Sequence, residues 1–425
     1  MLNRRAVVLA VVSSLALLAL LVPLAAAAPR TSVIVVDDES APGGDGSRQR
    51  PFNNLPDAVA VARTHARPVV VDVKPGDYRL VAPLLIDFPV TLRGSNEPVL
   101  NEGDPWPTGQ VAAGTETRVF ADSSVGAQAL IQIGRTDANV LTDVSVSRFT
   151  FQGTATGQEV LVTRVQRYLV ADNVFRAPAT FAFTSVASSG TLIANHFSGI
   201  GTGAIFNGGY PESPSNVVAV GNRAVNNNLG GILLNGASIN IPELGDQLSA
   251  IVRGNDLSGN TGTQGFGLRL FILRRDAGAP GATQSVAHVE ALVQDNRIVG
   301  NRVGLMVDAG FPYRRVAGVC DPRVFSGTID LELLGNSLSD SIVAPALITT
   351  TRNTAALTPS MLPTWQYLHG ATFSISDRDQ TLTGAWIDHP AADPFVGPCP
   401  ADATHEALEN TLIYNDVEVP NGRNF

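Results

Sequence analysis

Short apolar runs that end in Asn recur along the middle of the chain. They end at Asn173, Asn195, Asn222, Asn255, Asn296 and Asn336, at spacings of 22, 27, 33, 41 and 40 residues. An apolar residue follows two positions after each Asn, and a turn-forming residue usually follows four positions after it. A second apolar run then begins, often at a glycine such as Gly203 or Gly231. The runs are too short for helices and lack a helical period, so the pattern predicts short β-strands separated by turns.

A repeat of this kind cannot bury its apolar side alone, so successive repeats must stack as coils of a solenoid. Stacked Asn side chains can hydrogen-bond to one another and satisfy turn groups that would otherwise be buried without partners. The β-branched runs suit parallel pairing. The pattern therefore predicts an all-β protein, a right-handed parallel β-helix, over residues 141–350. A leucine-rich solenoid is the rival, but its period is steadier and its Leu pattern stricter.

The two ends of the chain are expected to close the solenoid, because exposed end coils would leave core residues in water. Residues 28–140 are predicted to hold the first coils and an N-terminal cap, in which Leu55–Arg63 forms a short amphipathic helix. Residues 351–425 leave the Asn repeat and are rich in Pro, Asp and Thr, so an irregular C-terminal cap is expected there.

The N-terminal half resembles the pectate-lyase-like β-helix superfamily. Four segments follow one another in the order usual for that superfamily: GGDGSRQRPF, LPDAVAVA, VVVDVKPGDY and FPVTLRG. With the Asn coils, the resemblance covers roughly residues 32–350. It implies the fold and leaves the activity open, because lyases, hydrolases, epimerases and non-catalytic surface proteins share this architecture. The family's usual catalytic motifs are mostly missing, and the string Trp386-Ile387-Asp388-His389, which resembles one pectate lyase motif, lies beyond the last Asn coil.

Residues 1–27 have the layout of a signal peptide, with a basic start, an apolar stretch from Ala6 to Leu24 and the small residues Ala25-Ala26-Ala27. Cleavage before Ala28 would make the protein secreted, either extracellular or periplasmic. The alternative is an uncleaved anchor helix, because the apolar stretch is nearly long enough to span a membrane. In an oxidising compartment Cys320 and Cys399 are expected to form a disulfide, with two buried thiols as the alternative.

Charge excludes nucleic acid as a partner. The 425 residues include 29 basic and 38 acidic ones, a net charge of −9, and removal of Arg4 and Arg5 with the signal peptide gives −9 − 2 = −11. No other stretch is apolar enough to enter a membrane, so no membrane contact is expected after cleavage. We expect a monomer.

The coils lengthen because segments at one point of successive repeats grow, at residues 208–216, 236–249, 274–287 and 309–327. Insertions at equivalent repeat positions stack on one side of a solenoid and commonly form its binding face. Aromatic and guanidinium groups suit sugar rings and carboxylates. The predicted substrate-binding residues are Arg274, Arg275, Tyr313, Arg314 and Arg315 in these loops, and Arg269 beside an outward column of Asn207, Asn235, Phe271 and Asp308. Loops that tolerate variation without function are the alternative.

Counting back from each Asn aligns the strands that follow the insertions. His288, Glu290, Asp330 and Glu332 should point outward, with Glu290 beside Asp330 on neighbouring strands. Adjacent carboxylates repel unless they share a cation or a proton, and Ca²⁺ prefers such oxygen ligands. The resemblance implies that Ca²⁺ held by stacked acids binds a sugar carboxylate while a base removes a proton from the sugar. The predicted metal ligands are Glu290, Asp330 and Glu332. The predicted catalytic residues are Arg253 and His288. An ordinary solvated sheet face is the alternative.

These observations favour a protein that interacts with carbohydrate, and its expected partner is a polysaccharide, for which an acidic polysaccharide is the candidate. A polysaccharide lyase is the enzymatic version of this hypothesis. A non-catalytic surface or structural β-helix protein is the alternative, and the missing catalytic motifs favour it.

Overall fold

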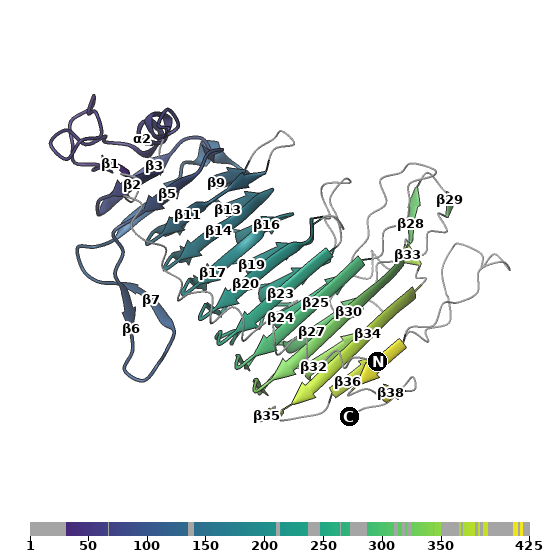
Figure 1. Cartoon of the computed structure of the whole chain (residues 1–425). Helices are drawn as coiled ribbons and strands as arrows, with labels where there is room; N and C mark the ends of the chain where they lie inside the picture. The colour runs from purple at the N-terminus through teal and green to yellow at the C-terminus, as the bar shows by residue number, and fades with distance from the viewer. Residues whose placement is uncertain are drawn as a thin grey trace, which may run out of the picture.

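The computed structural model describes residues 31–66, 68–134, 140–209, 213–236, 247–263, 265–272, 287–309, 313–316, 319–320, 325–342, 344–349, 365–366, 369–378, 381–382, 386–389, 411–414 and 417–419. The strands of these residues form a parallel β-helix with three long sheets, which we call sheets A, B and C (Figure 1). The predicted all-β, right-handed β-helix fold is confirmed.

Sheet A is the largest of the three. Its order is β1 (Ser32–Val36), β2 (Val69–Val73), β5 (Val90–Arg93), β11 (Val144–Ser147), β14 (Val165–Ala171), β17 (Ser189–Ile193), β20 (Ser215–Val220), β23 (Gln247–Arg253), β25 (Ala287–Gln294), β30 (Phe325–Leu334), β34 (His369–Arg378), β37 (Thr411–Tyr414) and β38 (Val417–Val419), and β10 (Leu141–Thr142) pairs with β14.

Sheet C follows the order β4 (Leu84–Ile86), β9 (Ala129–Gly134), β13 (Gln158–Thr163), β16 (Phe181–Val186), β19 (Thr202–Asn207), β22 (Gly230–Asn235), β24 (Phe266–Ile272), β27 (Val303–Ala309), β32 (Ala344–Thr349) and β36 (Trp386–His389). Sheet B holds β3 (Gly76–Leu80), β8 (Thr117–Ala121), β12 (Thr150–Gln152), β15 (Val174–Arg176), β18 (His196–Ser198) and β21 (Arg223–Val225), and continues through a bridge at Asp256 into β26 (Arg297–Val299), β31 (Ser337–Ser339) and β35 (Thr381–Leu382).

Each coil passes from sheet A to sheet B to sheet C and back to sheet A. The turn between sheets A and B carries the predicted Asn ladder, in which each buried side-chain amide donates to Oδ1 of the Asn in the next coil, from Asn173 through to Asn336, at 2.8–3.0 Å. A second ladder, which the sequence analysis did not identify, runs through Asn227, Asn260 and Asn301 at the turn between sheets B and C.

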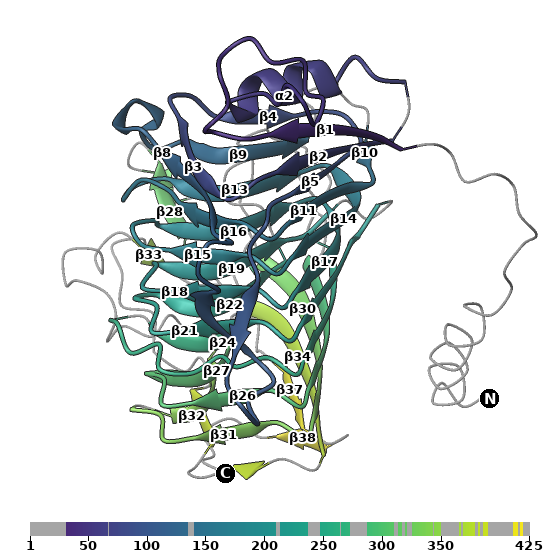
Figure 2. The same cartoon turned by 90° about the vertical axis from the view of Figure 1, so that its left-hand side faces the viewer.

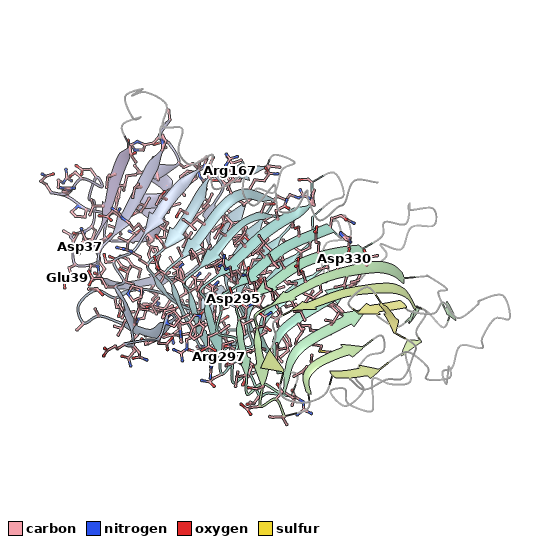
Figure 3. The ribbon with its side chains drawn as sticks, turned by 60° about the horizontal axis from the view of Figure 1, so that its bottom comes forward. Asp37, Glu39, Arg167, Asp295, Arg297 and Asp330 are labelled. Atoms are coloured by element: carbon pink, nitrogen blue, oxygen red, sulfur yellow. The ribbon has the colours of Figure 1, made fainter. Side chains whose placement is uncertain are left out.

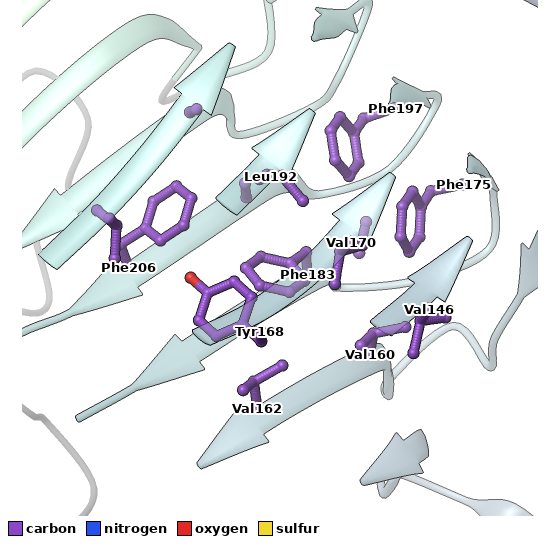
Figure 4. Close-up of a cluster of buried hydrophobic side chains, with 14 of the residues drawn as sticks. Val146, Val160, Val162, Tyr168, Val170, Phe175, Phe183, Leu192, Phe197 and Phe206 are labelled. Carbon is purple, nitrogen blue, oxygen red and sulfur yellow. The ribbon is translucent and has the colours of Figure 1, made fainter. Parts of the chain in front are cut away.

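The core is a continuous stack of apolar side chains enclosed by the three sheets. Phe151, Phe175 and Phe197 come from neighbouring strands of sheet B, and their ring centroids are 5.3 and 4.7 Å apart (Figure 4 labels the last two). Aromatic pairs at such distances add stabilisation beyond the area they bury. The inward alternation of Val289, Ala291 and Val293 on β25 is as predicted.

One acidic side chain is buried at the corner between sheets B and C. Glu159 occupies the position at which the next coils carry Ala182 and Gly203, and it is fully buried. Its Oε1 accepts a hydrogen bond from the backbone N–H of Gly153 at 3.0 Å, and Oε2 has no hydrogen-bond partner among the described residues. Burial raises the pKa of this carboxyl well above its ordinary value, so the side chain is held in its neutral form.

Helix α2 (Leu55–Ala62) lies at the N-terminal end of the β-helix, at the residues for which the sequence predicts a helix (Figure 1). Asn54 caps it by accepting from the backbone N–H of Asp57 at 2.9 Å, and Leu55, Val59 and Ala62 are buried. The other end differs from the prediction that residues after 350 leave the coils. There β34, β35 and β36 pair in parallel with β30, β31 and β32, because the open edge of each sheet offers unpaired backbone groups to the following chain.

A hairpin of β6 (Pro98–Leu100) and β7 (Pro107–Val111) leaves the first coils and lies across the outer face of sheet B (Figure 2). The Trp106 side chain donates from Nε1 to the carbonyl of Gly254 at 2.6 Å, and Asp104 pairs with Arg223 at 3.2 Å. Under the hairpin, His196 Nδ1 lies 3.1 Å from the carbonyl oxygen of Pro107. The hairpin is thus tied to coils far along the chain.

None of the helices that the structure describes has the length and apolar character needed to cross a membrane. Residues 1–27 lie outside the described residues, and so does Cys399; the predicted signal peptide and disulfide therefore stay predictions.

Candidate functional site

Outward side chains form a polar row along sheet A, near the edge at which the long connections from sheet C arrive. The row takes one residue from each of the successive strands β14, β17, β20, β23, β25 and β30. We define the polar row as Gln166, Ser189, Asn216, Ser249, Glu290 and Asp330. All six are exposed or partly exposed, so the row offers hydroxyl, amide and carboxylate groups to solvent.

A second row, which we call the apolar row, lies beside the polar row and consists of Leu169, Thr191, Val218, Ile251 and Leu292. It lies two residues further along β17, β20, β23 and β25, and three residues further along β14, where the bulge adds a residue. Leu169, Val218, Ile251 and Leu292 project from the same face, and Leu169 and Ile251 are each 40% exposed. Val218, Ile251 and Leu292 lie on neighbouring strands, whereas Thr191 separates Leu169 from them. Neighbouring aliphatic side chains that are partly exposed leave contiguous apolar surface in water. The two rows together give sheet A a polar edge next to an apolar strip.

Glu290 and Asp330 are directly paired positions on β25 and β30, as the sequence predicted. Neighbouring strands are about 4.8 Å apart, so the two carboxylates are neighbours in the polar row. Glu332 lies opposite Leu292, at the end of the apolar row and two residues from Asp330 along β30. Within the described residues, no three His, Cys, Asp or Glu side chains come together in a group that could hold a metal ion. Calcium bound here would therefore take most of its oxygen ligands from water or from a bound molecule.

His288 lies two residues before Glu290, at the loop side of the polar row. Its Nδ1 is 2.5 Å from Oγ1 of Thr328 and 3.8 Å from Oδ2 of Asp330. These contacts fix the ring orientation and leave Nε2 as the nitrogen available to a bound molecule. The structure thus brings His288, Glu290 and Asp330 together at one place.

Arg253 does not belong to that group. It pairs with Gln294, four residues beyond Glu290 along β25, which corresponds to about 13 Å at a rise of about 3.3 Å per residue. Its guanidinium lies 3.7 Å from Asp295 near the Asn turn, with more than half of its side chain exposed. Figure 3 shows Asp330 near the loop edge of sheet A and Asp295 toward the opposite edge. Arg253 and His288 therefore cannot act on the same sugar bond.

Each predicted insertion connects a strand of sheet C to the next strand of sheet A, so the described ends of the insertions lie at the same edge of sheet A. Of the predicted substrate-binding residues, Arg274 and Arg275 lie outside the described residues. Tyr313, Arg314 and Arg315 belong to β28 (Tyr313–Val316), which pairs with β29 (Val319–Cys320) and β33 (Trp365–Gln366), and the structure describes only their backbone.

The outward column of sheet C is a polar ladder that ends against an aromatic ring. Asn235 donates from Nδ2 to Oδ1 of Asn207 at 2.9 Å, Phe271 follows in register, and these three side chains are buried. Arg269 lies with its guanidinium 4.6 Å from the centre of the Phe271 ring, a cation–π contact. Because this column is covered, sheet A offers the more accessible surface.

A pocket of about 280 Å³ opens at the N-terminal end of the polar row. Gln166 and Ser189 of the row contribute to its lining, together with the turn residues Arg164 and Ala187. Val140 and the pair Ser213 and Pro214 line it from the preceding and following coils. The backbone N–H of Asn216 donates to the Ser189 hydroxyl oxygen at 2.9 Å, which leaves the hydroxyl proton for another acceptor.

The count of six positions before each ladder Asn aligns Asn216, Ser249, Glu290 and Asp330 in the sequence, but it does not reach the beginning of the polar row. Ser189 obeys the same count of six positions before a ladder Asn, whereas Gln166 lies seven positions before Asn173. The extra residue is a β-bulge between Gln166 and Tyr168, where Arg167 has a positive φ of 58° and pairs with Asp143. No periodic count could have found this displaced position.

No protein-family model matches the chain, and no curated protein matches its sequence. Among solved structures, it is similar to the DFA-IIIase of Arthrobacter chlorophenolicus A6 in complex with DFA-III, with 15% identity over 83% of this chain and 85% of that one and a TM-score of 0.38. It is also similar to the A-module of the mannuronan C-5 epimerase AlgE4 of Azotobacter vinelandii, with 13% identity, 77% and 87% coverage and a TM-score of 0.38. ORF18 of Geobacillus virus E2 has 9% identity, 84% and 61% coverage and a TM-score of 0.42.

Proposed function

We propose that this protein binds a polysaccharide along the polar row of sheet A. The observation that carries the proposal is the pairing of the polar row with the apolar row on one accessible face. A sugar ring has hydroxyl groups around its edge and apolar C–H faces, so it requires polar partners beside an apolar strip. Carbohydrate sites commonly combine these two kinds of surface.

The spacing of the row supports a linear polymer over a compact ligand. Each coil adds one hydrogen-bonding side chain about 4.8 Å from the last, a distance similar to the length of one sugar unit in an extended chain. A polymer lying across the strands would meet a new side chain with every sugar. Individually weak contacts would then add up along the polymer.

The finer proposal is that the polymer is acidic and that the protein is a lyase. Glu290 and Asp330 would repel a polymer with carboxylates unless a cation such as Ca²⁺ lies between them, and Ca²⁺ supplies that neutralisation when bound. In this proposal His288 acts as the base, which its contacts with Thr328 and Asp330 support. It would take the proton α to the sugar carboxylate while the bond to the 4-linked oxygen breaks, a double bond forms, and the leaving oxygen gains a proton from water.

The test of binding is titration of wild-type protein against acidic and neutral polysaccharides, with Ca²⁺ and with chelator. With Ca²⁺ present, Glu290→Gln and Asp330→Asn should each weaken binding roughly tenfold, because each removes a charge-assisted contact worth about 1.5–3 kcal/mol. Glu102→Gln is the matched control, since Glu102 is an exposed acid of the hairpin. Equal binding by all three variants would exclude the polar row as the site.

Catalysis is tested separately, by ultraviolet absorbance of the unsaturated product. A lyase gives a rise that depends on His288 and is lost in His288→Ala while binding is retained. Binding without any such rise would instead favour the non-catalytic surface protein. We also propose export through cleavage before Ala28, which sequencing the N-terminus of the mature protein would test.

A further inference from the structure

The pocket at the start of the polar row is bounded by residues of the preceding and the following coils. Gln166 and Ser189 belong both to the row and to the pocket, so the two surfaces are continuous. On the N-terminal side the pocket is bounded by Val140, which precedes β10. On the side of the connecting loops it is bounded by Ser213 and Pro214.

We propose that this pocket is a subsite for the terminal sugar of a polysaccharide bound along the polar row. The inference rests on the proposed function, and it adds a direction to the bound polymer: one chain end lies in the pocket and the rest runs toward Asp330. A volume of about 280 Å³ accommodates a single sugar ring. A chain that continued in both directions would meet the wall at Val140.

The chemistry of the lining suits one sugar ring. Val140 and Pro214 offer apolar surfaces on opposite sides, against which the C–H faces of a ring can pack. Ser189 and Gln166 form the polar base between them. The Ser189 hydroxyl accepts from Asn216 and can donate its proton to a ring hydroxyl, and the amide of Gln166 can donate and accept.

The neighbouring bulge strengthens the boundary. Arg167 of β14 and Asp143, which lies between β10 and β11, form a bidentate ion pair at 2.8 and 2.7 Å beside the pocket residue Gln166. Both side chains are mainly exposed, so the pair stands above the sheet surface where the row ends. Figure 3 shows Arg167 on the same side of the molecule as Asp330, at the other end of the row.

The test fills the pocket without altering the row. In Ser213→Trp an exposed wall residue is replaced by a bulky one, and Gln49→Trp places the same side chain on an exposed turn near the N-terminus as a control. Probes are short oligosaccharides and the intact polymer of whichever polysaccharide binds wild-type protein. Short oligosaccharides depend most on the end subsite, so Ser213→Trp should weaken their binding by at least about tenfold and that of the polymer far less.

Two results would overturn the proposal: unchanged binding of short oligosaccharides by Ser213→Trp, or an equal loss for short and long ligands. Val140→Trp, which fills the pocket from the opposite wall, repeats the test should Ser213→Trp fold poorly, and thermal unfolding reports on folding. Failure of the proposed function is distinct, because wild-type protein would then bind no polysaccharide at all.

Discussion

Oδ1 of Asn255 accepts two hydrogen bonds from Asn222, one from its backbone N–H at 2.8 Å and one from its side-chain Nδ2 at 3.0 Å. Both residues are fully buried. The same side chain of Asn255 donates onward to Asn296 and to the carbonyl oxygen of Ala219. One amide therefore satisfies backbone and side-chain groups of several coils, which explains why Asn recurs at this turn.

Asn255→Ala is expected to destabilise the protein by about 2–4 kcal/mol, because it leaves the buried N–H of Asn222 and the buried Oδ1 of Asn296 without this partner. Chemical denaturation of both proteins measures the change in the free energy of unfolding. Asn53→Ala, a change of a partly buried Asn before helix α2 and outside the ladder, serves as the comparison. Similar unfolding curves for the two variants would show that the ladder contributes little.

Glu159→Gln should stabilise the protein at neutral pH. Burial raises the pKa of Glu159, so the folded protein keeps a proton that the unfolded chain releases above its ordinary pKa. The folded state then holds more protons, and stability falls as pH rises. Gln keeps an oxygen that can accept from Gly153 and removes this dependence. Thermal unfolding should show a larger difference in melting temperature between the two proteins at pH 8 than at pH 4. The same difference in melting temperature at both pH values would argue against a neutral Glu159 in the folded protein.

Acid should weaken the structure through His196. Burial lowers the pKa of His196 to about 4, and the neighbouring guanidinium groups of Arg223 and Arg176 contribute to this lowering. The carbonyl of Pro107 and the carboxylate of Asp256 raise the pKa but do not offset the effect of burial. The unfolded chain therefore binds a proton below about pH 6.5 that the folded protein does not bind until about pH 4. Stability should fall by up to about 3 kcal/mol as pH falls through this window.

His196→Gln checks that interpretation, because Gln can still donate to the carbonyl oxygen of Pro107 but does not titrate. The variant should unfold with a shallower dependence on pH between about 4 and 6.5 than the wild-type protein. An identical dependence in the two proteins would assign the acid sensitivity to other groups.

The apolar row should contribute to ligand binding independently of charge. Ile251→Ser is expected to weaken polysaccharide binding by roughly threefold, because it removes part of an aliphatic surface worth about 25 cal/mol per Å² buried. Val33→Ser is a matched control, since Val33 is 48% exposed on β1, at the end of the same sheet. Salt concentration should not change the loss of affinity caused by Ile251→Ser. Equal changes in affinity for Ile251→Ser and Val33→Ser would show that the apolar row does not contact the ligand.

The coils and the face of sheet A were predictable because both depend on short-range periodicity. A buried Asn at a fixed turn and outward positions at fixed offsets from it, such as Glu290 and Asp330, follow from counting. Two other features depend on pairing between distant segments. The hairpin contact of Trp106 with Gly254 joins residues 148 positions apart, and the coil formed by β34 to β36 carries no Asn signal. The burial of Phe271 and Asn235, at positions that the strand alternation places on the outward side of sheet C, likewise follows from no local pattern.

A stack of coils is ordinarily a chain of nearest-neighbour contacts, from which end units can be lost one at a time. The hairpin over sheet B changes that expectation, because Asp104, Trp106 and Pro107 hold residues of several successive coils at once. Opening any of those coils requires release of the hairpin. Amide hydrogen exchange should therefore find that the segment from β15 to Gly254 opens as one cooperative unit. The hairpin would then convert the stepwise unfolding of single coils into one cooperative transition.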